Sequence, residues 1–416
     1  MSTLIKPFRG LRPAPGRAAE VAAPPYDVLS ADEARQRAKD KPWSFLHVSR
    51  PEIDLPADLN PYDPAVYAKA AENIGAMLAA GVLARDAAPC YYAYRLTMRT
   101  NAGAHVQTGL VATASVACYN NNRIKKHEFT RPDKEDDRVR QIEATNAQTG
   151  PVLLAYPDSA AADALIDAIA QGKAVADVTA DDGHTTVRHQ IWVLADAAQI
   201  DAITHCFDGM EALYIADGHH RSAAAARVAA ARRQEARELT SDYFLAVIFP
   251  RHDMKILDYN RVVKDLNGLQ KSALAGRLAD AFTVEESTKQ VKPELPGEFG
   301  MYLPGQWFKL TIKPELIPAD PVARLDVSLL SDHLLGPILG ITDLRRDKRI
   351  DFVGGVRGLS ELERRVKSGE MAVAFALHPT RMDQLMAVAD TNQVMPPKST
   401  WFEPKLADGL VSHVLD

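Results

Sequence analysis

Cysteine is scarce in this chain, and the signature motifs of several common enzyme classes are absent from it. The three cysteines, Cys90, Cys118 and Cys206, show no C-x-x-C spacing. The sequence therefore predicts neither a disulfide framework nor a cysteine zinc site, and it is typical of a reducing cytoplasm. The chain has no G-x-x-x-x-G-K-[ST] or G-x-G-x-x-G motif, which disfavours P-loop nucleotidases and dinucleotide oxidoreductases. It has no G-x-S-x-G elbow either, which disfavours an α/β-hydrolase.

Long apolar runs and an excess of positive charge are also lacking. No run approaches the roughly 20 residues that a membrane-spanning helix needs. Lys6, Pro7 and Arg9 stand where a signal peptide would need an apolar segment. We therefore expect a cytoplasmic protein with no membrane partner. The net charge of −5 argues against a general nucleic-acid-binding protein.

The chain has an ordinary globular composition, with 46% apolar and 25% charged residues. Its 416 residues exceed a typical single core, so we expect two domains. Short apolar strands alternate with helical segments, which predicts an α/β (α+β) fold with a mixed sheet and flanking helices. We expect a site-bearing α/β core over residues 1–268 and a C-terminal α/β domain over residues 269–416. Assembly into a homo-oligomer is compatible with this composition.

Several elements are predicted from local patterns. Ser30, followed three residues later by Glu33, predicts a capping box at the start of a helix. The apolar stretches at residues 45–49 and 106–119 predict strands, and residues 101–103 predict a hairpin turn before the second of them.

The most informative stretch is a polar turn between a short apolar strand and an alanine-rich helix. Leu213 to Ala216 has the pattern of a buried strand end, and residues 222–239 are rich in strong helix formers. Between them lie Asp217, Gly218, His219, His220 and Arg221. Asp217 suits a helix N-cap, and Gly218 can adopt a left-handed dihedral that other residues resist.

Such a turn offers the donors that an anion needs. A helix N-terminus presents free N–H groups and a partial positive charge, and Arg221 and two imidazoles add donors. The turn is therefore predicted to bind phosphate through Gly218, His219, His220, Arg221 and Ser222. The alternative is a structural turn whose histidines are exposed or hydrogen-bonded. Adjacent histidines point about 100° apart on a helix, so no metal site is predicted there.

A second group of ionisable residues lies earlier in the chain. Lys125, Lys126, His127 and Glu128 precede a strongly charged segment. A charge run is usually a solvated face, but a His–Glu pair beside cations also fits proton transfer. Asp217 or Glu128 is the candidate base, and His127 joins them as a candidate catalytic residue. We expect this segment and the central turn to face the same cleft.

Motifs along nearly the whole chain are similar to those of DUF1015, a bacterial and archaeal family whose name denotes a domain of unknown function. These motifs are Lys6–Gly10, Pro24–Val28, Lys125–Glu128, Asn146–Pro151, the central turn and Pro396–Phe402. Two of them supply candidate substrate-binding residues, namely Lys126, Asn146 and Gln148. Tyr26 and Asp27, held rigidly by the preceding prolines, suit either an Asx-stabilised turn or the wall of a substrate site.

The central turn also resembles the Gly-x-x-Arg signature of the ParB/sulfiredoxin-like fold, in which sulfiredoxins and free-serine kinases hold nucleotide phosphates. That resemblance implies phosphoryl chemistry on a small hydroxylated metabolite, with serine as the first candidate.

These features predict a nucleotide-dependent phosphotransferase for which ATP or ADP and Mg²⁺ are the cofactors. Mg²⁺ is typically held by one or two carboxylates together with substrate phosphates. Two alternatives stay open, a phosphatase or other hydrolase of a phosphorylated metabolite and a non-catalytic nucleotide or metabolite sensor. Turnover distinguishes the sensor from both enzymes, and nucleotide dependence distinguishes the two enzymes.

Overall fold

The computed structural model describes residues 3–100, 103–181, 185–233 and 237–416. The chain divides into two compact units, one formed by the residues up to Met254 together with Pro404–Asp416, and one formed by Lys255–Glu403. This division differs from the expected boundary at residue 268. Residues 255–268 belong to the second unit, and the C-terminal residues return to the first.

Strand pairing explains both differences. β14 (Tyr259–Val263) lies between β18 (Ile350–Gly354) and β19 (Val373–Leu377), so it is part of the second unit's sheet. β21 (Ser412–Val414) pairs with β2 (Gly10–Pro13) and β7 (Ala147–Gln148), which anchors the C-terminus in the first unit. With β3 (Leu83–Arg85), these three strands form a four-stranded sheet.

A mixed sheet forms the centre of the first unit, as predicted. Within the described residues it has nine strands, eight of them in the order β6-β11-β8-β12-β5-β4-β10-β9, with β1 pairing on β5. The pairs β6·β11 and β8·β12 are parallel, and the other pairs are antiparallel. The bounds are β1 (Ile5–Lys6), β4 (Tyr91–Thr100), β5 (Gly103–Ser115), β6 (Ile124–Lys125), β8 (Val152–Tyr156), β9 (Ala176–Asp181), β10 (Thr186–Leu194), β11 (Leu213–Asp217) and β12 (Tyr243–Pro250).

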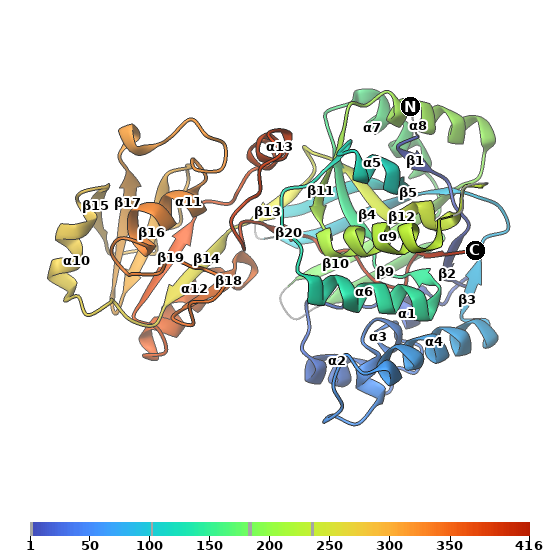
Figure 1. The fold of residues 1–416 in the computed structure, drawn as a ribbon, viewed down its shortest axis with the longest axis horizontal. Coiled ribbons are helices and arrows are strands. Elements are labelled where there is room, and N and C mark those ends of the chain that lie inside the picture. The colour runs from blue at the N-terminus through green and yellow to red at the C-terminus, as the bar shows by residue number, and fades with distance from the viewer. Residues whose placement is uncertain (1–2, 101–102, 182–184, 234–236) are drawn as a thin grey trace. The chain divides into compact units, whose positions relative to one another are not determined.

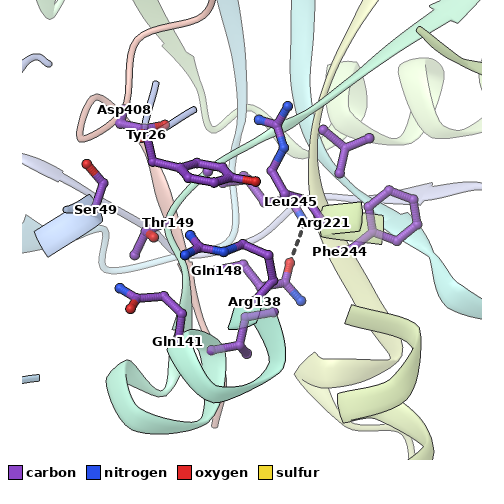
Figure 2. A pocket seen from close by; sticks show the side chains of 13 residues that line it. Tyr26, Ser49, Arg138, Gln141, Gln148, Thr149, Arg221, Phe244, Leu245 and Asp408 are labelled. Atoms are coloured by element: carbon purple, nitrogen blue, oxygen red, sulfur yellow. Dashed lines mark hydrogen bonds between the residues drawn. The ribbon is translucent and has the colours of Figure 1, made fainter. Parts of the chain in front are cut away.

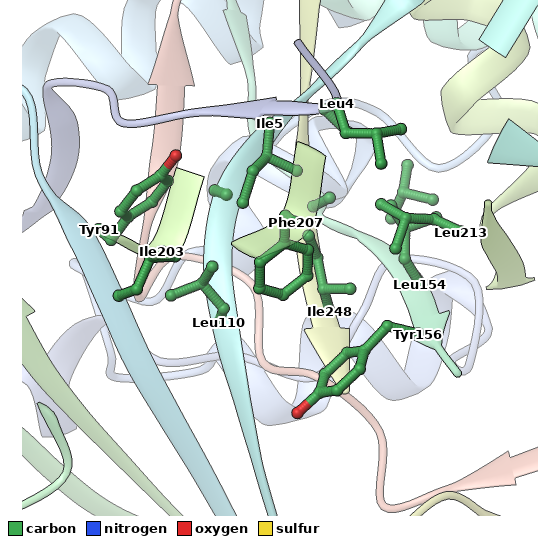
Figure 3. Close-up of a cluster of buried hydrophobic side chains, with 14 of the residues drawn as sticks. Leu4, Ile5, Tyr91, Leu110, Leu154, Tyr156, Ile203, Phe207, Leu213 and Ile248 are labelled. Atoms are coloured by element: carbon green, nitrogen blue, oxygen red, sulfur yellow. The ribbon is translucent and has the colours of Figure 1, made fainter. Parts of the chain in front are cut away.

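The largest hydrophobic core packs on this sheet (Figure 3). Leu110, Leu154 and Ile248 from three neighbouring strands meet Ile203 and Phe207 of α8 (Ala197–Asp208), and α7 (Ala160–Ile169) adds further side chains. Every residue of β12 is buried, which suits its continuous apolar run.

The alanine-rich helix α9 (His219–Arg232) packs on two neighbours at once. Ala225 and Ala229 join the core of the sheet. Ala224 and Val228 instead pack with Ile142 of α6 (Pro132–Thr145). Alanine combines the strongest helix propensity with a small side chain, so it suits a helix enclosed on both sides.

The N-terminal helices surround a smaller core. They are α1 (Ala18–Val21), α2 (Ala31–Ala38), α3 (Leu46–Ser49), η1 (Pro51–Asp54) and α4 (Pro64–Ala79). The predicted capping box is confirmed, because the Glu33 N–H donates to Ser30 Oγ (3.3 Å) and the Ser30 N–H donates to Glu33 Oε2 (2.8 Å).

Two predicted strands need correction. Residues 45–49 form helical turns, because Phe45, Leu46 and Val48 all point into this small core. The strand predicted for residues 106–119 ends at Ser115, whose side chain caps α5 (Val116–Asn120) by accepting from the Cys118 N–H. Asn101 and Ala102 of the predicted hairpin turn lie outside the described residues, but β4 and β5 on either side pair as expected.

The second unit is built on a six-stranded antiparallel sheet in the order β15-β17-β16-β19-β14-β18. Its other elements include the two-stranded sheet of β13 (Lys255–Leu257) and β20 (Trp401–Glu403). The bounds not yet given are α10 (Lys271–Leu278), β15 (Phe282–Ser287), β16 (Glu298–Leu303), β17 (Gln306–Ile312), α11 (Asp326–Leu330), α12 (Gly358–Lys367) and α13 (Met382–Asp390). No helix in the described part of the chain has both the length and the apolar character needed to cross a membrane.

Candidate functional site

The central turn connects a strand to a helix as predicted, with β11 ending at Asp217 and α9 beginning at His219. Gly218 has a φ of +102°, the left-handed conformation expected for it. A Cβ at this position would lie 3.0 Å from Arg221 Nε, so glycine also allows the guanidinium to lie against the backbone. The expected N-cap role of Asp217 is wrong, because Gly218 occupies that position and makes no side-chain cap.

The Asp217 carboxylate instead lies beside two cations. Its Oδ2 is 3.5 Å from Arg221 Nη2 and 4.0 Å from Lys405 Nζ. Partial burial acts to raise the pKa of Asp217, but the charges of Lys405 and Arg221 outweigh it and hold that pKa below its usual value. Asp217 is therefore ionised at neutral pH, and its side chain is 40% exposed.

Arg221 is largely buried, and one nitrogen of its guanidinium already bonds the backbone of another segment. Its Nη1 donates to the Pro151 carbonyl at 2.6 Å, and its side chain is only 10% exposed. Burial acts to lower the pKa of Arg221, but the carboxylates of Asp217, Asp27 and Asp408 outweigh it and raise that pKa. Arg221 thus supplies a permanent positive charge beneath the first turn of α9.

The Lys125–Glu128 segment lies against the central turn, so their expected proximity is confirmed. β6 runs parallel to β11, with Ile124 paired to Leu213. Glu128 Oε2 is 3.4 Å from His219 Nδ1, an ion-pair distance without the alignment of a good hydrogen bond. Burial acts to raise the pKa of Glu128, but the close His219 ring outweighs it and lowers that pKa. Glu128 is therefore an ionised carboxylate with a 41% exposed side chain.

His127 is buried and packs against His219. It is 1% exposed, and its ring stands edge-on to that of His219 with 4.4 Å between centroids. Burial, with a smaller contribution from His219, lowers the pKa of His127 to about 3. Its ring nitrogens make no well-formed hydrogen bond within the described residues, and the Ile215 carbonyl is the acceptor nearby. A neutral ring shielded from solvent suits packing, so the structure favours a supporting role for His127 over the catalytic role expected of it.

Two candidate phosphate ligands have their side chains engaged in the fold. His220 Nε2 accepts from the Arg131 N–H at 3.1 Å, which fixes the loop that carries Glu128. Ser222 is completely buried, and its hydroxyl donates to the carbonyl of His219 at 3.0 Å. These side chains position the turn, and neither is free to bind a phosphate.

Three candidate substrate-binding residues also have structural roles. Lys126 Nζ donates to the Tyr119 carbonyl at 2.7 Å and lies over the Tyr119 ring. Asn146 is the left-handed C-cap of α6, and its amide bonds the Leu415 carbonyl and Arg232. Gln148 bonds the backbone of β12 through both ends of its amide, accepting from the Leu245 N–H at 2.6 Å.

The Tyr26 loop, in contrast, borders a cavity. Arg50 holds the loop by donating to the Tyr26 carbonyl at 2.8 Å, and the Arg138 guanidinium lies 4.0 Å from the Tyr26 ring centroid. The cavity has a volume of about 30 Å³, and Tyr26, Arg138 and Arg221 are among its lining residues (Figure 2). Burial raises the pKa of the Tyr26 hydroxyl to about 12. Asp27 is exposed at the edge of the loop.

Sequence reasoning missed three charged residues around these positions, namely Arg138, Lys405 and Asp408. In the sequence, Arg138 stands out only as one member of a charged segment. Asp408 is 2% exposed and lines the same cavity as Arg138. The signal that could have revealed it is an Asp-Gly pair within an otherwise apolar C-terminal segment, because a carboxylate in such a setting needs a partner.

The carboxylates of the site do not form a metal centre by themselves. Within the ranges that the structure describes, no three histidine, cysteine, aspartate or glutamate side chains are grouped to hold a metal ion. Asp217 and Glu128 could therefore hold Mg²⁺ only with the help of ligand oxygens, as is common for this ion.

Comparison with solved structures finds distant similarities. A free serine kinase mutant in complex with AMP gives a TM-score of 0.35 at 14% identity, covering 72% of this chain and 92% of that chain. A conserved hypothetical protein from Pyrococcus furiosus gives 0.34 at 16% identity, covering 72% and 95%. SbnI from Staphylococcus aureus, truncated at its C-terminus, gives 0.36 at 11% identity, covering 72% and 85%. TM-scores this low do not establish a shared function.

Sequence comparison is more decisive about the family. The search of curated proteins gave no match. A family model described as "Protein of unknown function (DUF1015)" matches residues 5–328, which is well over half of the chain, and the chain therefore belongs to the DUF1015 family.

Proposed function

We propose that this protein is a nucleotide-dependent phosphotransferase that phosphorylates a small hydroxylated metabolite, with serine as the first substrate to test. One observation carries the proposal, namely the Glu128 carboxylate 3.4 Å from His219 Nδ1 in the first turn of α9. This contact sets a candidate proton acceptor beside a candidate phosphate-binding helix terminus.

The phosphate would lie at the N-terminus of α9. The first N–H groups of a helix have no intrahelical partner and carry a partial positive charge, so they attract oxyanions. Gly218 has no side chain to block an oxyanion from the backbone. Arg221 beneath the turn and Lys405 beside it add two positive charges. The backbone of Gly218–Arg221 and these cations therefore fit a nucleotide phosphate.

Glu128 is the better of the two candidate bases. Asp217 already lies beside both Arg221 and Lys405, whereas Glu128 is half-exposed and, among the residues that the structure describes, forms an ion pair with His219 alone. In the reaction, the substrate alcohol oxygen forms a bond to the terminal phosphorus and its proton passes to Glu128. The bond from that phosphorus to the bridging oxygen breaks, and the nucleotide leaves with one phosphate fewer. Mg²⁺ would neutralise phosphate charge, with Asp217 as the carboxylate that would hold it.

The test is an assay of the full chain with ATP or ADP, Mg²⁺ and a panel of small alcohols that includes serine, with formation of ADP or AMP, respectively, as the readout. Glu128→Gln keeps the size of the side chain but cannot accept the proton. It should lose at least ~100-fold in turnover, while nucleotide affinity measured by calorimetry stays near that of the wild type. Glu143→Gln, which makes the same charge change at an exposed position of α6, is the matched control and should retain activity.

Other outcomes would support the alternatives. Phosphate release from phosphorylated metabolites without any nucleotide would indicate a hydrolase, and nucleotide binding without turnover would indicate a sensor. Full phosphotransfer in excess chelator would contradict the role given to Mg²⁺.

A further inference from the structure

The cavity beside the Tyr26 loop is lined by several polar and charged side chains (Figure 2). It is bordered by Tyr26, by Arg138 of α6, by Ser49 at the end of α3, and by Asp408 of the C-terminal segment. These residues are far apart in the sequence but all belong to the first unit. Its volume of about 30 Å³ is room for roughly two water-sized groups.

Two polar atoms on the wall of this cavity lack partners. Ser49 Oγ and Asp408 Oδ2 are buried and make no hydrogen bond within the described part of the chain. The two residues are only 4% and 2% exposed. Buried polar groups in native proteins are nearly always hydrogen-bonded, so two such groups on one cavity indicate a bound partner.

The wall is rich in hydrogen-bond donors. The Ser49 hydroxyl is one, and the Arg138 guanidinium is another, held in place by its bonds to Asp137 and by the Tyr26 ring. Burial raises the pKa of Asp408 to about 7, so its carboxyl keeps its proton in mildly acidic solution and acts there as a donor. A partner that supplies acceptor oxygens would satisfy all three groups.

We propose that this cavity binds the carboxylate group of a small organic acid, with Ser49, Arg138 and Asp408 as its hydrogen-bond donors. Two carboxylate oxygens match the room available, whereas a tetrahedral phosphate is larger. The nearby Asp27 carboxylate also disfavours a dianion. The acid is either the acceptor of the phosphoryl group or a separate ligand, and the proposal requires only the carboxylate.

The proposal implies that binding depends on pH. Four groups act on the Asp408 carboxyl: Arg221 and Arg138 favour its ionised form, Asp27 opposes ionisation, and the Tyr26 N–H donates to it. An ionised Asp408 would repel a carboxylate and could not donate to it. Affinity should therefore be highest below about pH 7 and fall as the pH rises through that value.

The experiment is calorimetric titration of the full chain with acetate, glycolate and inorganic phosphate at pH 6 and pH 8. Both acids should bind more tightly at pH 6, and phosphate should not compete with them. Ser49→Ala should weaken acetate binding at least about tenfold, the effect of losing one hydrogen bond to a charged group. Its control is Ser241→Ala, because the Ser241 hydroxyl is also buried, has no hydrogen-bond partner among the described residues, and does not border the cavity.

Asp408→Asn gives a second and independent readout. Asparagine stays neutral, so this variant should bind acetate with little difference between pH 6 and pH 8. If the acid is the acceptor, glycolate will be phosphorylated and acetate will inhibit competitively. If the acid is a separate ligand, acetate will bind without competing with the acceptor.

Three results would overturn the proposal. They are the absence of acid binding at pH 6, equal effects of Ser49→Ala and Ser241→Ala, and displacement of bound acetate by phosphate. Because the titration measures binding directly, it can succeed or fail whether or not the protein transfers phosphate.

Discussion

Replacing Arg221 with methionine would remove a buried charge at the centre of the site while keeping most of the side-chain volume. The variant loses the charged hydrogen bond to the Pro151 carbonyl, a contact of 2.6 Å worth ~1.5–3 kcal/mol. The ion pair with Asp217 adds little, because that carboxylate is 40% exposed and solvent screens it. We therefore expect the free energy of unfolding to fall by ~2–3 kcal/mol at pH 6.

The loss in free energy of unfolding caused by Arg221→Met should grow with pH, because Arg221 also affects the ionisation of Asp408. Its pKa of about 7 lies above the ordinary value, so its contribution to stability is present in acid and is lost as the pH rises through 7. Arg221 lowers this pKa, so the methionine variant has a still higher pKa at Asp408 and loses more stability at pH 8. Each further pKa unit costs ~1.4 kcal/mol, so the difference between wild type and variant should widen by ~1 kcal/mol between pH 6 and pH 8.

Urea unfolding of the full chain at both pH values, followed by hydrogen exchange of α9 amides, measures this effect. The control is Arg227→Met, which removes a 45% exposed arginine of the same helix, α9, that pairs with Glu135 and Asp136 of α6. A surface pair of this kind contributes ~0–1 kcal/mol. Equal losses in the two variants, or an Arg221→Met effect that shrinks as the pH rises, would refute the reasoning.

Two further predictions concern stability alone. Burial raises the pKa of Asp326 in the second unit to about 7, so this carboxyl loses its contribution to stability as the pH rises towards 7. Asp326→Asn cannot ionise and should be more stable than the wild type by on the order of 2–4 kcal/mol at pH 8, but not at pH 4, by urea unfolding. Gly218→Ala should cost ~1–2 kcal/mol, because alanine resists a φ of +102°. Gly75→Ala, in the middle of α4 with open space around it, should instead gain ~0.5–1 kcal/mol, and equal effects of the two changes would contradict this account.

The central turn could be predicted because local chemistry determines it. An apolar strand end, a glycine and an alanine-rich run allow few other conformations, and the structure follows them from Leu213 to Arg232. The proximity of Glu128 to His219 was also predictable, since a donor-rich turn with one paired carboxylate lacks a free base. The mixed sheet followed from the alternation of apolar strands and helices.

The side-chain roles could not be predicted in the same way. Asn146, Gln148, Lys126 and Ser222 are polar residues in suggestive positions, but their groups bond the backbone of distant segments. A sequence does not reveal whether a hydrogen-bonding group is already used, because that depends on which strands become neighbours. The strand wrongly predicted at residues 45–49 has the same origin, since a short apolar run suits a strand or a helical turn until its core is known.

Two carboxyl groups of the first unit, Glu128 and Asp408, have pKa values shifted in opposite directions by their environments. Glu128 is half-exposed beside His219, and its pKa is lowered, so it carries no proton at neutral pH. Asp408 is buried, and its pKa is raised to about 7, so it still holds a proton in mildly acidic solution. Arg221 pairs with Asp217 at the end of β11 and borders the cavity that Asp408 also lines. An ionised Glu128 and a protonated Asp408 are the two states that our two proposals need, because one carboxyl must accept a proton from an alcohol while the other donates a hydrogen bond to a carboxylate.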